Sequence, residues 1–197
     1  FCQNAVIAAG QVGKEISPER LGQIFFELRD QGALNINLVT PTHYAPLIAP
    51  VALHARAQGF DLPFVWNTSG YETVKALHAI APVADVFLAD FKYAHSELAR
   101  TFSHAVDYPA VALDTLDAMV EITGEPQFDE YHGQLRMTRG VVVRHLLLPG
   151  HVPESCAAVE LLHKRYGKKV LLSLMNQYTP VLDASSAAAR KYPELLR

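Results

Sequence analysis

The stretch ADVFLAD at positions 84–90 is apolar from Val86 to Ala89 and ends in an aspartate. Short, nearly continuous apolar runs of this kind are typical of strands that are buried on both faces of a parallel sheet. Four further runs share the pattern: ALNINLV at 33–39, LPFVWN at 62–67, GVVVRHLLL at 140–148 and KKVLLSLM at 168–175. These five runs decide the fold, because each predicts a buried strand.

Helix-like stretches separate the five runs. The first, at 17–32, has Ser17 as its N-cap, Pro18 at the first helical position and Gly32 as a C-terminal stop. Five more lie at 44–59, 71–80, 96–103, 109–122 and 154–166. The alternation predicts an α/β fold with a parallel sheet and right-handed crossovers, either a closed or partial barrel or an open doubly wound sheet. The His-Gly pair within 127–140 predicts an inserted hairpin.

The composition indicates one globular domain over residues 1–197. Half of the residues are hydrophobic (50%) and 19% are charged, which is enough to bury a substantial core. The formal net charge of −3 gives no support for nucleic-acid binding, and no apolar run is long enough for a transmembrane helix. Two cysteines make no disulfide framework, so we expect a cytoplasmic protein without nucleic-acid or membrane partners.

Polar side chains follow each of the five runs. In a parallel sheet of either type, the carboxyl ends of the strands lie at one edge and carry the functional site. The polar residues at these ends are Thr40, Thr42 and His43; Asn67, Thr68 and Ser69; Asp90 and Lys92; Arg144, His145 and His151; and Asn176, Gln177, Tyr178 and Thr179. Asn, Ser and Thr are also ordinary turn residues, but their presence at five consecutive strand ends predicts a site.

Asp90, Lys92 and Arg144 carry the charge at this edge. Residues i and i+2 of a strand face the same side, so Asp90 and Lys92 are expected to face one site. Buried charges persist when they are paired or bind a ligand, which leaves a structural Asp90–Lys92 ion pair or a bound polar ligand as alternatives. Arg144, inside an apolar strand, needs an anion, either from a ligand or from a hairpin carboxylate such as Asp129 or Glu130.

The stretch FCQN at 1–4 introduces a resemblance to a known family. It is similar to the end of the C-x-x-x-C-x-aromatic-C-x-N motif of radical S-adenosylmethionine (SAM) enzymes. The whole chain resembles proteins related to pyruvate formate-lyase activating enzyme, through GKEISPERLGQIFFELRDQGALNINLVTPTHY, LPFVWNTSGYE, FLADFKY, VVVRHLLLPG and SLMNQYTP. The resemblance implies a partial (β/α)6 TIM-like barrel whose first strand and cluster loop are missing from this chain, which would begin inside the cysteine motif.

The resemblance also implies cofactors and a reaction. A [4Fe–4S] cluster held by three cysteine thiolates would cleave SAM reductively to a 5′-deoxyadenosyl radical, which abstracts a hydrogen atom. The substrate would be a glycyl-radical protein or a small molecule, and a flavodoxin or ferredoxin would donate the electron. Because Cys2 is the single cysteine in the motif position, we expect this fragment to be inactive and free of cofactors, and the full-length protein to carry two more cysteines upstream.

The resemblance assigns roles to residues by their position in the motifs. Cys2 corresponds to the third cluster ligand, and Asp90 and Lys92 to a catalytic Asp-x-Lys. Arg144 corresponds to a partner for the carboxylate of SAM, which suits arginine geometry. The residues that would bind the cofactor are Asn4, Thr40, Thr42, His43, Asn67, Ser69, Asp90, Lys92, Arg144 and Gln177. The chain departs from the family at 40–43, which lacks the Gly-Gly-Glu segment for the methionyl amine.

Two other functions are compatible with the same residues. A barrel lyase or aldolase would use Lys92 as a Schiff-base amine, provided that its site keeps the amine neutral. A non-catalytic binding module would use the polar strand ends without any chemistry. Both remain alternatives to the radical SAM hypothesis.

Overall fold

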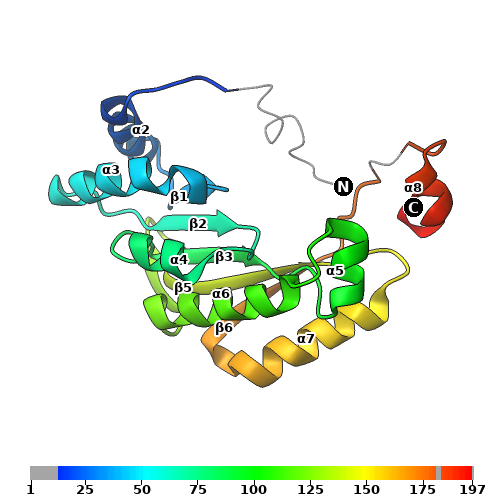
Figure 1. Cartoon of the computed structure of the whole chain (residues 1–197). Coiled ribbons are helices and arrows are strands. Elements are labelled where there is room, and N and C mark those ends of the chain that lie inside the picture. The colour runs from blue at the N-terminus through cyan, green and yellow to red at the C-terminus, as the bar shows by residue number, and fades with distance from the viewer. Residues whose placement is uncertain (1–12, 181–182, 197) are drawn as a thin grey trace.

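The computed structural model describes residues 13–180 and 183–196. Within them, helices and strands alternate as predicted and form a mixed α/β fold around a six-stranded sheet (Figure 1). The predicted site residues Cys2 and Asn4 lie outside the described residues. No helix in the described part of the chain is both long and apolar enough to cross a membrane.

Five strands form the parallel part of the sheet. Their order across the sheet is β1-β2-β3-β5-β6, and each neighbouring pair is parallel. They span Ile36–Val39 (β1), Phe64–Thr68 (β2), Val86–Asp90 (β3), Gln134–Leu146 (β5) and Val170–Met175 (β6). Each of the five apolar runs is thus confirmed as a strand. Among the described residues β1 and β6 do not pair with each other, so the sheet is open.

The predicted hairpin is also confirmed. β4 (Gln127–Tyr131) pairs antiparallel with the first half of β5, and the second half of β5 continues into the parallel sheet. Gly140 lies at the junction with a φ of +124°, and a Cβ there would lie only 2.8 Å from Pro126 Cα. Because the hairpin strand runs through this glycine without a break, β5 starts at Gln134 and not at 140 as predicted.

The first helix begins where its predicted cap, Ser17, places it. α2 (Pro18–Asp30) follows Ser17, whose hydroxyl accepts a hydrogen bond from the Arg20 amide at 3.2 Å. α4 (Val74–Ile80) follows Thr73, which caps the Ala76 amide in the same way. The other elements are α3 (Ala45–Ala57), α5 (Ser96–Ser103), α6 (Tyr108–Thr123), α7 (Val152–Tyr166), α8 (Ala187–Lys191) and 3₁₀ helices at Thr42–Tyr44, Gly167–Lys169 and Pro193–Leu196.

The two faces of the sheet differ in how well they are covered. Trp66, Phe87 and Val143 point toward the packed helices and are fully buried. Leu88 and Val142 alternate with them along the strands, face the other side and are only partly buried. Figure 1 shows α4, α6 and α7 along one side of the strands. Among the described residues helices cover one face, and on the other face Val65 and Val86 are buried while Leu88 and Val142 are partly buried, so the expected burial on both faces holds only in part.

Candidate binding site at the carboxyl ends of the strands

A charged network crosses three neighbouring strands at the carboxyl edge of the sheet. Asp90 ends β3, Arg144 lies opposite it on β5, and Asn67 lies near the end of β2. Arg144 Nη2 donates a hydrogen bond to Asn67 Oδ1 at 2.8 Å and lies 2.7 Å from Asp90 Oδ1. Lys92, just beyond β3, donates from Nζ to Asp90 Oδ2 at 2.5 Å. We call these four residues the carboxyl-end network.

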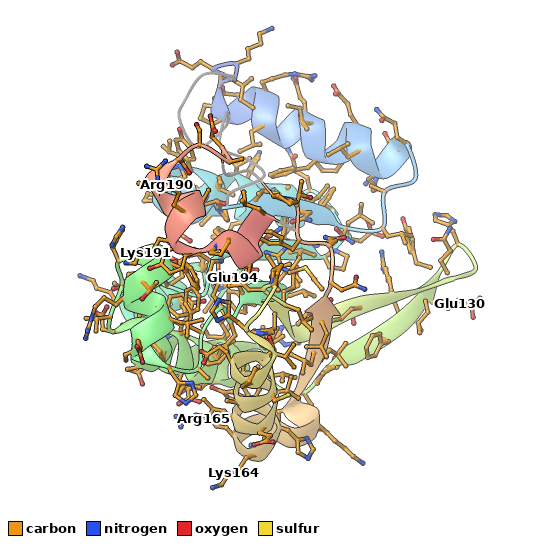
Figure 2. All side chains as sticks on the ribbon, turned by 90° about the vertical axis from the view of Figure 1, so that its right-hand side faces the viewer. Glu130, Lys164, Arg165, Arg190, Lys191 and Glu194 are labelled. Atoms are coloured by element: carbon orange, nitrogen blue, oxygen red, sulfur yellow. The ribbon has the colours of Figure 1, made fainter. Side chains whose placement is uncertain are left out.

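The network decides between the alternatives that the sequence left open for Arg144. Its guanidinium group turns toward Asp90 and Asn67, and the hairpin carboxylates take no part. Asp129 instead accepts two hydrogen bonds from Arg136, at 2.8 and 3.0 Å, within the hairpin itself. Figure 2 shows Glu130 on the projecting hairpin, away from the body of the protein. The hairpin alternative is therefore wrong.

Asp90 contacts both cations of the network, so the ion pair with Lys92 is present but is not isolated. Lys92 Nζ is engaged with the Asp90 carboxylate, whereas a Schiff base needs this nitrogen free to attack a carbonyl group. The geometry therefore supports a binding role for Lys92 better than a lyase or aldolase role.

The network has unsatisfied capacity for a ligand. Two cations, Lys92 and Arg144, share one carboxylate. Within the described residues, Asp90 Oδ1 and Arg144 Nε are buried and have no hydrogen-bond partner. The 2.7 Å contact between Asp90 and Arg144 has the length of an ion pair but not the alignment of a hydrogen bond. An unpaired buried polar atom costs about 1–3 kcal/mol, so a ligand that offers one acceptor and one donor would be favoured.

The loop after β2 lies directly against the end of β3. Gly70 has a φ of +73°, and a Cβ there would lie 2.0 Å from the carbonyl oxygen of Asp90. Only glycine permits this approach. The Thr68 hydroxyl accepts a hydrogen bond from the Gly70 amide at 3.1 Å, while Ser69 accepts a longer one from Tyr71 at 3.4 Å. The structure thus brings Thr68 and Ser69 to the predicted edge, but their hydroxyls serve their own loop.

The loop after β1 joins the same edge. The Thr40 amide donates to the carbonyl oxygen of Asn67 at 2.8 Å, and Thr40 has a φ of +50°. A positive φ is strained for a β-branched residue, and such strain is often found at functional sites. Thr42 and His43 follow in a 3₁₀ turn and lie beside Glu72 from the β2 loop. Burial raises the pKa of Glu72, and Thr42 and His43 offset part of the rise.

Glu72 is a site residue that the sequence reasoning missed. Its signal was present in NTSGYE, as an acidic residue shortly after a strand end. Because Glu72 lies beyond the end of β2, the sequence does not show that it is close to Thr42 and His43, and only the folded loop brings them together. Glu72 adds a partly desolvated carboxyl group to the carboxyl edge.

Three predicted side chains lie apart from the network. His145 points to the helix-covered face, where it contacts a backbone carbonyl at 2.7 Å and the Ser155 hydroxyl at 2.9 Å. His151 contacts Glu194 of the C-terminal segment at 3.3 Å. Gln177 is exposed after β6, and within the part of the chain that the structure describes no hydrogen bond joins it to the network. His145 and His151 thus make contacts elsewhere in the structure, and none of the three side chains joins the network.

The described residues contain no metal centre. Within 13–180 and 183–196, no three His, Cys, Asp or Glu side chains come together in a way that could hold a metal ion. Cys156, at the start of α7, is exposed. Cys2 lies outside the described residues, so cluster ligation by Cys2 stays a prediction.

Comparison with known proteins adds a distant relative. No family model matches this chain. The chain is similar to Uncharacterized protein MJ0674 of Methanocaldococcus jannaschii, with 26% identity over 211 residues. The match covers 100% of this chain and 53% of the relative, so the chain spans about half of the relative's length. Because the relative's name states no activity, we infer function from the carboxyl-end network.

Proposed function

We propose that this protein is a radical SAM enzyme related to pyruvate formate-lyase activating enzyme, with a partial (β/α)6 barrel. The observation that carries the proposal is the carboxyl-end network of Asn67, Asp90, Lys92 and Arg144. The strand order supports the barrel, because β1-β2-β3-β5-β6 follows the chain without reversal and helices cover one face. A doubly wound sheet reverses its strand order and carries helices on both faces.

The network fits the methionyl group of SAM, which is a zwitterion with a carboxylate and an ammonium group. Arg144 Nε lacks an acceptor, which a carboxylate would supply. Asp90 Oδ1 lacks a donor, which an ammonium group would supply. A charge-assisted hydrogen bond of this kind is shorter and stronger than a neutral one. One amino-acid group would thus satisfy both atoms at once.

Lys92 and Asn67 hold the side chains of Asp90 and Arg144 in place. Lys92 binds Asp90 through Oδ2, while Oδ1 pairs with Arg144 Nη2 at 2.7 Å without an aligned hydrogen bond. Asn67 accepts from Nη2 of Arg144 and so orients the planar guanidinium group. The partly buried Leu88 and Val142 lie on the same face of the sheet and limit the access of water. We therefore assign binding to Asp90 and Arg144 and positioning to Lys92 and Asn67.

The iron–sulfur cluster does not fit the described residues, since they hold no group of three metal-binding side chains. Cys2 would be one of its three thiolate ligands. Bound together, cluster and SAM would supply a hydrogen-abstracting 5′-deoxyadenosyl radical, with one electron delivered by a flavodoxin or ferredoxin. We propose a glycyl-radical protein or a small molecule as the source of the hydrogen atom.

Calorimetric titration of the full-length protein with SAM tests the binding part of the proposal. We expect Arg144→Lys to weaken SAM binding about tenfold, because lysine cannot reproduce the fork of donors. Arg56→Lys is the matched control, since Arg56 is similarly exposed (29% against 24%) and lies at the opposite edge of the sheet. The control should bind SAM normally. Absence of SAM binding, or an equal loss in both variants, contradicts the proposal.

Cofactor cleavage tests the enzymatic part. The full-length protein, reconstituted anaerobically with iron and sulfide and then reduced, should convert SAM to methionine and 5′-deoxyadenosine. Arg144→Lys should slow this conversion at low SAM concentration and recover at high concentration, because it affects binding. A protein that binds SAM but never cleaves it would be a binding module, and the enzyme assignment would fail.

A further inference from the structure

The hydroxyl group of Tyr108 lies between the two loops that carry the site. The Lys92 amide donates to Tyr108 Oη at 3.1 Å, and Oη lies 3.0 Å from the Ser69 carbonyl and 2.9 Å from the Asp90 carbonyl. A phenol has one proton and accepts through its lone pairs. Tyr108 therefore accepts from Lys92 and donates to Ser69 or Asp90, or shares its proton between them. One hydroxyl group joins the β2 loop to the end of β3.

The Tyr108 ring is held firmly. It is 3% exposed, stacks on Tyr71 at a centroid distance of 5.8 Å and makes an edge contact with Tyr93 at 5.6 Å. The Tyr71 hydroxyl donates to the carboxylate of Asp107, the residue before Tyr108, at 2.7 Å. Burial, together with the charge of Asp90, raises the pKa of Tyr108 far above its usual range. Tyr108 is thus held as a neutral hydrogen-bonding group.

The backbone that Tyr108 contacts is held on its other side as well. The Phe91 amide donates to the Arg144 carbonyl at 2.8 Å, which ties the chain just before Lys92 to β5. Gly70 lies against the Asp90 carbonyl, and its hypothetical Cβ would be 3.4 Å from Tyr108 Oη. The chain from Asp90 to Lys92 is therefore held between β5 and the Tyr108 hydroxyl.

We infer that Tyr108 is a positioning residue for the carboxyl-end network. Its hydroxyl fixes the backbone of Asp90 and Lys92 so that the Lys92 ammonium group reaches Asp90 Oδ2 and leaves Oδ1 toward the ligand. The inference rests on the proposed function only in taking SAM as the ligand. The effect on Lys92 itself needs no ligand.

Tyr108→Phe tests the inference, and Tyr166→Phe is its matched control. Tyr166 is also buried (6% exposed), and its hydroxyl donates to the Leu113 carbonyl at 3.2 Å and contacts Asp117 Oδ1 at 2.9 Å. It ends α7, just before β6 begins, at the opposite edge of the sheet. Each change removes one buried phenol hydroxyl, so both variants should lose a similar few degrees of Tm.

The readout is the NMR signal of Lys92 after reductive methylation of the lysines with ¹³C-formaldehyde, assigned with Lys92→Arg. In Tyr108→Phe we expect this signal to move toward that of an exposed lysine and the Kd for SAM to rise about tenfold. Tyr166→Phe should change neither. An unchanged Lys92 signal together with unchanged SAM affinity in Tyr108→Phe overturns the inference. If the signal moves but the wild type binds no SAM, the positioning role stands and the proposed function fails.

Discussion

The two ends of β3 each carry an aspartate paired with an arginine. Asp85 precedes the strand and contacts Arg56 at 2.5 Å, and Asp90 ends the strand 2.7 Å from Arg144. The side chains are almost equally exposed, at 25% and 29% in the first pair and 21% and 24% in the second. Burial therefore does not distinguish the pairs.

The pairs differ in how far the protein satisfies them. Asp85 Oδ2 also accepts from the Phe64 amide at 2.8 Å, and Arg56 donates to the Phe60 carbonyl at 2.9 Å. At the carboxyl end, Asp90 Oδ1 and Arg144 Nε have no hydrogen-bond partner in the described part of the chain. The Asp85 pair thus stabilises the fold, whereas the Asp90 pair retains capacity for a ligand.

The largest effect is expected from a substitution that disturbs only the carboxyl end of the strands. Gly70→Ala adds a Cβ 2.0 Å from the Asp90 carbonyl oxygen, at a positive φ. We therefore expect the free energy of unfolding to fall by about 3 kcal/mol and SAM binding to be lost. Gly59→Ala, just after α3, is the control, because Gly59 has a similar positive φ (+85°) but nothing within 4 Å of its Cβ position. It should cost about 1 kcal/mol. Equal losses in urea denaturation would show that the close approach does not matter.

The second prediction compares the aspartates directly. Asp85→Ala leaves the Phe64 amide and Arg56 without their acceptor, so the free energy of unfolding should fall by about 2 kcal/mol while SAM binding persists. Asp90→Ala should also lower stability, because it leaves Lys92 and Arg144 without their shared carboxylate, and of the two variants it alone should weaken SAM binding. Urea denaturation and calorimetry measure both quantities. Equal changes in stability and in SAM binding for the two variants would contradict the contrast between the two ends of β3.

The smallest expected effect concerns Glu72, a further carboxyl group at the carboxyl end. Because burial raises its pKa above the ordinary value of 4.5, the native state binds this proton more tightly than the unfolded state. Its contribution to stability is therefore full below pH 4.5 and is lost as the pH rises through the native pKa. Glu72→Gln should remove this decrease in stability. As the pH rises, the Tm of the wild type should therefore fall in comparison with the Tm of the variant.

Glu27 is a control for which we expect the opposite pH dependence of stability. It lies on α2, where the hydrogen bond from Arg20 lowers its pKa. Wild type should therefore gain stability relative to Glu27→Gln as the pH rises from acid toward neutral. Two pH profiles with the same sign would contradict the assignment of burial as the cause for Glu72.

Local pattern in the sequence was enough to predict the strands, the hairpin and the edge that carries the site. Apolar runs and capping residues act over a few positions, so Ser17 marks a helix start whatever the rest of the chain does. The rule that parallel strands share a carboxyl edge then placed Asn67, Asp90 and Arg144 together. Resemblance to a family supplied the proposed ligand, SAM.

Tertiary structure alone decided which of these groups meet. Arg144 had a choice of carboxylates, and the strand register, which depends on contacts far apart in the sequence, selected Asp90 over Asp129. In the described part of the chain, the same long-range packing places helices along one face of the sheet and returns Glu72 to the edge. It also sets the Tyr108 hydroxyl against the backbone of Lys92. No local pattern encodes these contacts, because each depends on where a distant segment packs.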